Sequence, residues 1–166
     1  MAQVGVERRE VHIRPSVSAA GAGTYALLLR IDVTEEIAIG RRHRLRMAPG
    51  WAVYVGSAFG PGGAAARLAH HRRPAVRPHW HIDDLRSRAA LRAVWISHDP
   101  IHRECLWATV LREDLGGVPP PFRFGASDCR CAAHLHRFPD RPALTAFVAA
   151  LRVRCPAHAA VLEQAE

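Results

Sequence analysis

Gly23-Thr24-Tyr25 and Tyr54-Val55-Gly56 are the two stretches that decide the fold. The first opens an apolar run that continues to Val33, and the second closes an apolar run that begins at Trp51. Short runs of this kind, rich in branched and aromatic side chains and bounded by charges or turn residues, are typical of buried β-strands. We therefore expect two strands, each with a tyrosine and a glycine together at one end.

The residues between these two runs alternate in polarity. Apolar and charged side chains alternate from Glu36 to Arg46, which predicts one half-exposed strand with Gly40 at a turn or bulge. Pro49-Gly50 then predicts a tight turn into the next strand. We expect the three strands to form an antiparallel meander.

Helical spacing dominates the rest of the chain. The break Gly60-Pro61-Gly62-Gly63 is followed by an alanine-rich helix from Ala64 to His71, which Pro74 must end. The patterns further on predict a strand over 91–97 and helices over 80–88, 101–115 and 140–153. Together these elements predict an α+β fold with a small, mostly antiparallel sheet of three to four strands flanked by helices.

The length of 166 residues predicts a single domain. We assign that domain to residues 22–154, with a flexible N-terminal leader over 1–21 and a C-terminal tail over 155–166. No apolar run approaches the roughly 20 residues of a membrane span, and the first residues lack the apolar core of a secretory signal. We therefore expect a cytoplasmic protein without a membrane partner, and the sequence leaves its oligomeric state open.

Charge is unevenly distributed along the chain. All 23 basic residues are arginines and the formal net charge is +8, but coding bias alone can produce an arginine-rich chain. Residues 51–103 contain eight arginines against three acidic residues, whereas residues 104–166 contain seven of each. Six of the eleven histidines lie between His70 and His102. A basic, histidine-rich central segment suits an anionic partner such as nucleic acid.

A set of short motifs follows in a fixed order: the two triplets above, Gly60-Pro61-Gly62-Gly63, His79-Trp80-His81-Ile82-Asp83, Glu104-Cys105, and the stretch from Phe124 to Leu135. In this order the motifs resemble the GIY-YIG nuclease superfamily. The resemblance is closer still to its DUF123 branch, members of which occur joined to endonuclease III-type DNA glycosylases. It covers residues 22 to about 138. It implies a GIY-YIG-like domain, divalent-metal-dependent hydrolysis of DNA, and a role beside DNA-repair glycosylases.

The same resemblance assigns roles to individual residues. Tyr25 and Tyr54 would be the phenols, one of them activating water, and His71 matches the usual histidine of the family. Arg67 would bind the scissile phosphate, a role that suits a permanently charged, bidentate guanidinium. One Mg²⁺ or Mn²⁺ ion would be held by Glu104. The residues expected to bind substrate are Gly23, Gly56, Ser57, His79 and His81.

One position departs from the pattern of several family nucleases. Where they carry a lysine that can take the proton of the tyrosine, this chain has Ser57. A free phenol has a pKa of about 10 and is a poor base near neutrality. Because imidazole titrates near neutral pH, His71, His79 or His81 could replace the lysine.

The four cysteines form a second pattern. Cys129, Cys131 and His134 are spaced as three ligands of a zinc site, with Cys105, His136 or a histidine of the 79–81 segment as the fourth. The alternative is that these are small buried cysteines beside a histidine near the groove. Disulfides are not expected in a cytoplasmic protein.

The sequence supports three functions. The first is a metal-dependent DNA endonuclease. The second is a nucleic-acid-binding module of the same fold that has lost catalysis, an alternative favoured by Ser57. The third is a zinc-stabilised interaction domain built around the Cys–His pattern.

Overall fold

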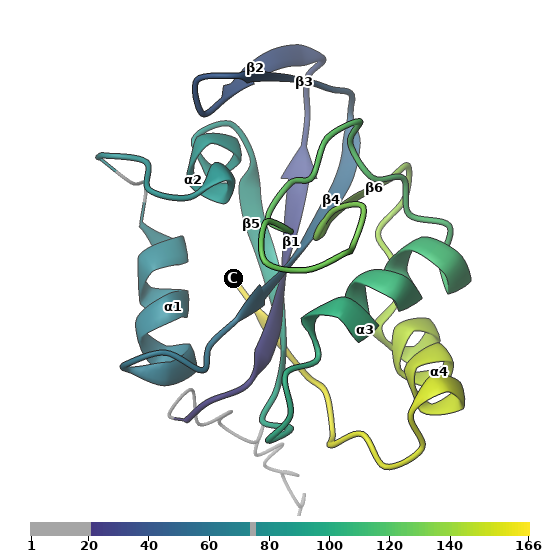
Figure 1. Cartoon of the computed structure of the whole chain (residues 1–166). Helices are drawn as coiled ribbons and strands as arrows, with labels where there is room; N and C mark the ends of the chain where they lie inside the picture. Colours follow the sequence, from purple (N-terminus) through teal and green to yellow (C-terminus); the bar gives the residue numbers. More distant parts are fainter. Residues whose placement is uncertain (1–20, 74–75) are drawn as a thin grey trace, which may run out of the picture.

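The computed structural model describes residues 21–73 and 76–166, so the expected leader over 1–21 lies, apart from its last residue, outside the described residues. The described part of the chain has the expected α+β architecture (Figure 1). Its main sheet is antiparallel with strand order β6-β4-β1-β5-β7. The strands span Thr24–Ile31 (β1), Gly50–Ser57 (β4), Ala90–Ser97 (β5), Leu135–Phe138 (β6) and Leu162–Ala165 (β7).

The expected three-stranded meander is wrong. Strands β2 (Glu35–Ile39) and β3 (His43–Met47) form a separate two-stranded sheet, and β1 pairs directly with β4. The reason is Gly40, whose φ of 56° allows the chain to reverse sharply between β2 and β3. The alternating stretch is therefore a hairpin, which buries its apolar side chains in the core and leaves its charged ones exposed.

The main sheet has five strands, where three to four were expected. Strand β7 lies within residues 155–166, which were expected to be a tail. Its side chains are mostly exposed and show no apolar alternation, so the sequence pattern does not mark it as a strand. Contacts with the domain hold it in place: the indole N–H of Trp95 donates to Glu163 at 2.7 Å, and Glu166 pairs with Arg72.

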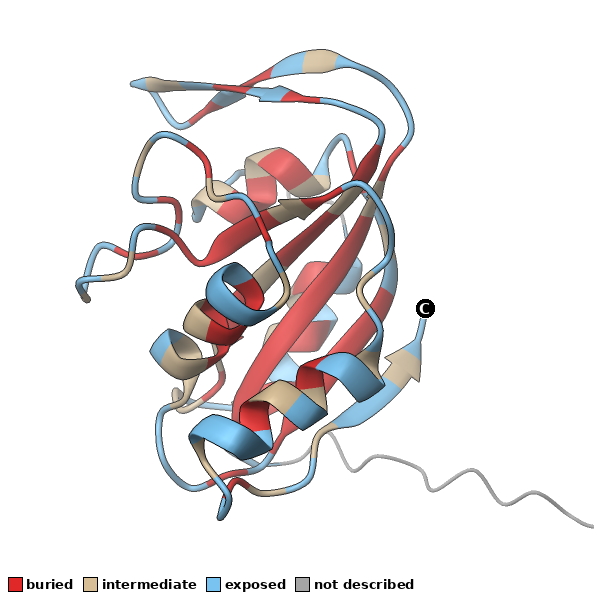
Figure 2. Ribbon diagram, turned by 90° about the vertical axis from the view of Figure 1, so that its right-hand side faces the viewer, coloured by how far each residue is buried: buried red, intermediate tan, exposed pale blue. Residues whose placement is uncertain are grey.

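The helices cover the two faces of the main sheet. One face packs against α1 (Gly63–Arg72), α2 (His81–Arg86) and the β2–β3 hairpin. The other packs against α3 (Glu104–Thr109), the π-helical turn η1 (Val110–Asp114) and α4 (Leu144–Arg154). Figure 2 looks onto this second face and shows the buried central strands behind the helices. None of the helices in residues 21–73 and 76–166 combines the length and apolar character that crossing a membrane requires.

Candidate active site

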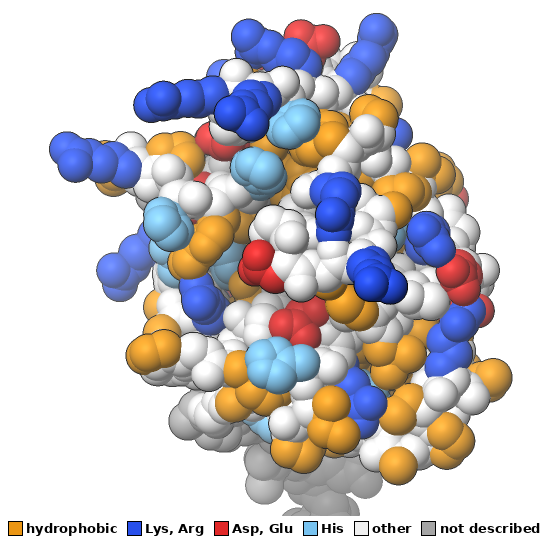
Figure 3. Space-filling view, viewed as in Figure 1, with side chains coloured by type: hydrophobic (Ala, Val, Ile, Leu, Met, Phe, Trp, Pro, Cys, Tyr) orange, Lys and Arg blue, Asp and Glu red, His pale blue; other side chains and the backbone are white. Residues whose placement is uncertain are grey.

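A cleft of about 700 Å³ lies between α1, α2, the ends of β1 and β4, the start of α3 and the loop before β6. Figure 3 looks toward this side of the molecule, where histidine and acidic side chains lie near the middle and arginines project from the upper and left margins. Eleven of the predicted site residues line it: Tyr25, Tyr54, Gly56, Ser57, Arg67, His71, His79, His81, Glu104, Cys129 and His134. Gly23 and Cys131 are not among the lining residues.

The register of β1 and β4 places both phenols over one end of the sheet. Tyr25 lies opposite Gly56, and Tyr54 lies opposite Leu27, so the two tyrosines share one face of the sheet. A Cβ atom on Gly56 would collide with the ring of Tyr25. Gly125, with a φ of 67°, likewise leaves room for the ring of Tyr54. Each phenol therefore lies against the bare backbone of a glycine.

Gly23 has a structural role here. A side chain at this position would collide with the backbone carbonyl of Ser97 on β5. The glycine therefore allows the chain entering β1 to lie close against the end of β5. Gly23 does not line the cleft, and its expected substrate contact stays a prediction.

Helix α1 turns Arg67 and His71 toward the cleft because residues four apart lie on the same side of a helix. Ala64 and Leu68 anchor the helix in the core. The guanidinium of Arg67 lies 4.6 Å from the centre of the Trp80 ring, a cation–π contact. No carboxylate in residues 21–73 or 76–166 pairs with Arg67, so its N–H groups are available to an anion.

A buried hydrogen bond of 2.7 Å joins the Tyr25 hydroxyl to Nε2 of His71. Burial, followed by the nearby His70, lowers the pKa of His71 to about 4, so the imidazole is neutral at pH 7. Nδ1 of His71 is also buried and has no hydrogen-bond partner among the described residues. Nothing on that side of the ring fixes the tautomer, so Nε2 can either accept the phenol proton or donate to the phenol oxygen.

Both tyrosines are kept protonated by their surroundings. Burial, and then the neighbouring Tyr54, raises the pKa of Tyr25 far above its usual value of 10. Burial, and then Asp83, raises the pKa of Tyr54 to about 12. A phenol in this cleft can therefore take a proton from water only if its own proton passes to a partner. Tyr25 has such a partner in His71.

Asp83 connects α1 to the segment that begins α2. One carboxylate oxygen lies 2.8 Å from Nε2 of His70, and the other accepts the backbone N–H groups of His79 and Trp80. Burial opposes the ionisation of Asp83, but these hydrogen bonds outweigh it and lower its pKa. The network fixes Trp80, which in turn supports Arg67. The ligand atoms of His70, His71 and Asp83 also lie close enough to hold a metal ion, although hydrogen bonds already engage Nε2 of both histidines and the Asp83 carboxylate.

Glu104 is the first residue of α3, and its half-buried carboxylate lines the cleft. One of its oxygens lies 3.4 Å from Nδ1 of His102, another cleft residue. The only other carboxylate among the residues lining the cleft is Asp128, on the opposite loop. Glu104 and Asp128 are thus the two carboxylates among the residues that line the cleft, and the metal role expected of Glu104 stays a prediction.

The cysteine pattern folds into one compact group. The ligand atoms of Cys105, Cys129, Cys131 and His134, here called the Cys–His group, all lie within 4.8 Å of one another, so this group could hold a metal ion. Of the candidates for the fourth metal ligand, Cys105 is the one whose sulfur atom lies beside the other three ligand atoms. His136 belongs to neither of the potential metal-binding groups among the described residues.

Sequence patterns did not single out His70 or Arg123, although Arg123 lines the cleft and His70 holds Asp83. His70 acts through a contact with a separate segment, its hydrogen bond to Asp83, whereas Arg123 donates locally to the carbonyl of Ala126. His70 is next to a predicted site residue, which was the one available signal.

Comparison with known proteins identifies one family. The family described as "Domain of unknown function DUF123" matches residues 24–156. The chain therefore belongs to the DUF123 family. No curated protein and no solved structure matches it. The family match includes every residue that lines the cleft and all four members of the Cys–His group.

We predict that Gly56→Ala lowers the free energy of unfolding by about 1–3 kcal/mol, because the added methyl group must displace the buried Tyr25 ring. Gly60→Ala is the matched control. Its methyl group would meet only one terminal nitrogen of Arg67, at 3.4 Å, so its effect should stay below about 1 kcal/mol. Urea denaturation of both variants measures the difference, and equal losses would contradict this packing.

We also predict a pH dependence of stability that comes from His71. Its pKa is about 4 in the folded chain against an ordinary 6.5, so between these values the unfolded chain binds a proton that the folded chain does not. Stability therefore falls as the pH falls through this window. His71→Gln should remove about 2 kcal/mol of the loss between pH 7 and pH 5.

Denaturation curves at the two pH values test this, with His79→Gln as the control because the side chain of His79 is exposed. An unchanged pH dependence in His71→Gln would show that His71 is not buried in its neutral form.

Proposed function

We propose that this protein is a divalent-metal-dependent DNA endonuclease of the GIY-YIG type. The observation that carries the proposal is the convergence of Tyr25, Tyr54, Arg67, His71 and Glu104 on one cleft, from β1, β4, α1 and α3. These groups were expected from separate motifs far apart in the sequence. A phosphodiesterase needs an activated water, a cation for the phosphate and a stabilised leaving oxygen, and the cleft contains a group suited to each.

The Tyr25–His71 pair is the proposed route for the proton of the attacking water. The water gives its proton to the Tyr25 oxygen while the phenol proton passes to Nε2 of His71, 2.7 Å away. The water oxygen then bonds to phosphorus, and the P–O bond on the opposite side breaks. Because the imidazole is neutral, it can accept this proton, and the anionic phosphate would stabilise the imidazolium that forms. His71 thus takes the place of the lysine that Ser57 replaces.

Arg67 is the proposed phosphate ligand. Its guanidinium is held over Trp80 and has no carboxylate partner among the described residues. A positively charged group fixed in advance loses little freedom when it binds an anion, and it stabilises the charge that builds up on the phosphate oxygens.

Glu104 is the proposed ligand of one Mg²⁺ or Mn²⁺ ion. A single carboxylate suits these cations, because Mg²⁺ keeps several of its waters and binds through one or two carboxylates and the substrate phosphate. When bound, such an ion stabilises the negative charge of the leaving oxygen. Glu104 would be supported by His102, whose ring lies beside its carboxylate.

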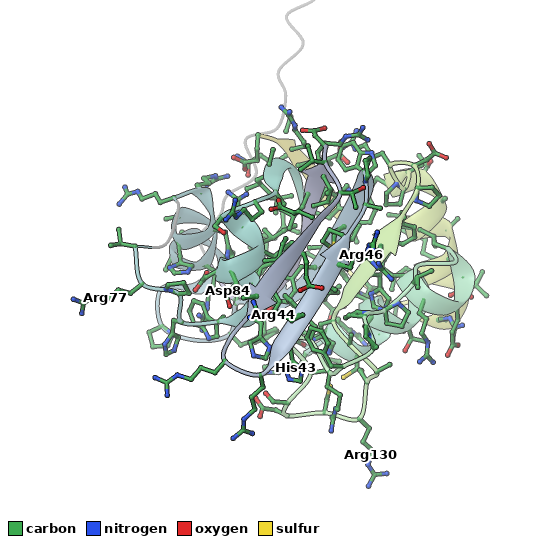
Figure 4. All side chains as sticks on the ribbon, turned by 90° about the horizontal axis from the view of Figure 1, so that it is seen from above. His43, Arg44, Arg46, Arg77, Asp84 and Arg130 are labelled. Atoms are coloured by element: carbon green, nitrogen blue, oxygen red, sulfur yellow. The ribbon has the colours of Figure 1, made fainter. Side chains whose placement is uncertain are left out.

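Exposed arginines on the surface of the domain support nucleic acid as the substrate. In Figure 4, Arg44 and Arg46 lie on the hairpin, and Arg77 and Arg130 extend outward on two sides of the domain. All four are exposed. Such side chains bind phosphates without selecting a base sequence. A role in DNA repair beside endonuclease III-type glycosylases remains a proposal that rests on the family resemblance.

A second candidate is a DNA-binding module of the same fold without activity. Ser57 in place of a lysine and the raised pKa values of both phenols favour it. The two candidates share the phosphate site and differ only in cleavage.

The test is nicking of single-stranded, duplex, branched and abasic DNA in Mg²⁺ or Mn²⁺. Arg67→Ala and Glu104→Gln should each reduce the cleavage rate by about 100-fold or more, because each removes a charge that stabilises the transition state. Arg152→Ala on α4 and Asp140→Asn before it are controls of matched charge outside the cleft, and should cleave like the wild type.

DNA binding measured at several salt concentrations separates the two candidates. Salt-sensitive binding that Arg67→Ala weakens, with no cleavage of any substrate, would support the inactive module. Cleavage that persists equally in both cleft variants would contradict the proposed active site, and binding that is absent or insensitive to salt would contradict both candidates.

A further inference from the structure

The Cys–His group joins two separate parts of the fold. Cys105 is the second residue of α3, whereas Cys129, Cys131 and His134 belong to the irregular loop that precedes β6. The loop is tied to the sheet by the His134 carbonyl, which accepts from the backbone N–H of Val55 on β4. The N–H of His134 donates to the carbonyl of Phe124 within the loop. The ligand atoms of the four side chains lie together where the start of α3 meets this loop, so a metal ion bound there would join the two segments.

The spacing of the four ligand atoms fits a tetrahedral zinc ion. All of them lie within 4.8 Å of one another, and Sγ of Cys129 lies 3.4 Å from Nε2 of His134. Zn–S bonds of about 2.3 Å and Zn–N bonds of about 2.0 Å place the ligand atoms of a tetrahedral site about 3.5–4 Å apart. The side chains would therefore need only small movements to surround the ion.

The ligand types also select the metal. Three sulfur atoms and one imidazole nitrogen favour zinc over Mg²⁺ or Mn²⁺, which prefer oxygen ligands. Four protein ligands leave no open position for water, as in structural rather than catalytic zinc sites.

We propose that Cys105, Cys129, Cys131 and His134 bind one structural zinc ion, which clamps the loop before β6 to the start of α3. Two neighbours connect this clamp to the cleft. Cys105 follows Glu104 directly, and the same loop carries Gly125, against which the Tyr54 ring lies. The ion therefore holds in place the wall of the cleft that contains Glu104. The proposal does not depend on nuclease activity, because the zinc site would exist equally in an inactive module.

The test is the metal content of the full-length protein purified without chelators and measured by plasma mass spectrometry. The wild type should contain about one zinc per chain. Cys105→Ser and Cys131→Ser should each contain less than about a tenth of that amount, because three ligands bind zinc far more weakly than four. Cys155→Ser is the matched control: this cysteine lies at the end of α4, outside the group, and its loss should leave the zinc content unchanged.

A second measurement does not depend on the folding of any variant. Cobalt(II) added to the zinc-depleted wild type should give the intense visible bands of tetrahedral coordination and the thiolate-to-cobalt charge-transfer band. Less than about a tenth of an equivalent of zinc in the wild type together with an octahedral cobalt spectrum would overturn the proposal. A mass two hydrogens lower than the reduced chain, located to a disulfide within the group, would also overturn it. Equal zinc in the wild type and Cys105→Ser would exclude Cys105 as a ligand and overturn the clamp.

Discussion

The contact of the Tyr25 ring with the bare backbone of Gly56 is the constraint on which the candidate site depends. It lets the phenol lie against the backbone of β4 and reach Nε2 of His71, so one hydrogen bond joins the central strand of the sheet to helix α1. The same helix carries Arg67, and the Asp83 network sets Trp80 beneath its guanidinium. Burial then keeps the phenol and the imidazole neutral. Arg67, which has no carboxylate partner among the described residues, remains as a positive charge beside them.

In the proposed account, two kinds of metal chemistry meet at the start of α3. Glu104 presents an oxygen ligand to the cleft, and Cys105 presents sulfur to the loop before β6. Hard cations such as Mg²⁺ select the first and zinc the second. The adjacent residues Glu104 and Cys105 would thus bind two different ions, one that takes part in the reaction and one that is structural. The structural ion would fix the backbone from which the reacting ion is held.

Local sequence patterns predicted the elements whose side chains repeat with a clear period, and the motifs contain many of the residues that line the cleft. The α+β class was confirmed. Arg67, His71 and Glu104 line one cleft, and the roles expected of them stay predictions. The hairpin was missed because apolar and charged side chains alternate on both sides of Gly40, where the chain reverses. Strand β7 was missed because contacts between distant segments, such as that of Trp95 with Glu163, hold it rather than any apolar pattern. The fourth member of the Cys–His group stayed open for the same reason: it lies on a different element.

A crystal structure with Mn²⁺ and a short DNA duplex bound would test the central claim most directly. The account predicts an anomalous manganese peak at Glu104, a phosphate in contact with Arg67, and a water aligned for attack within hydrogen-bond distance of the Tyr25 hydroxyl. The Tyr25–His71 hydrogen bond should remain in place. A phosphate bound elsewhere, with Glu104 free of metal and Arg67 turned away from the DNA, would contradict the account.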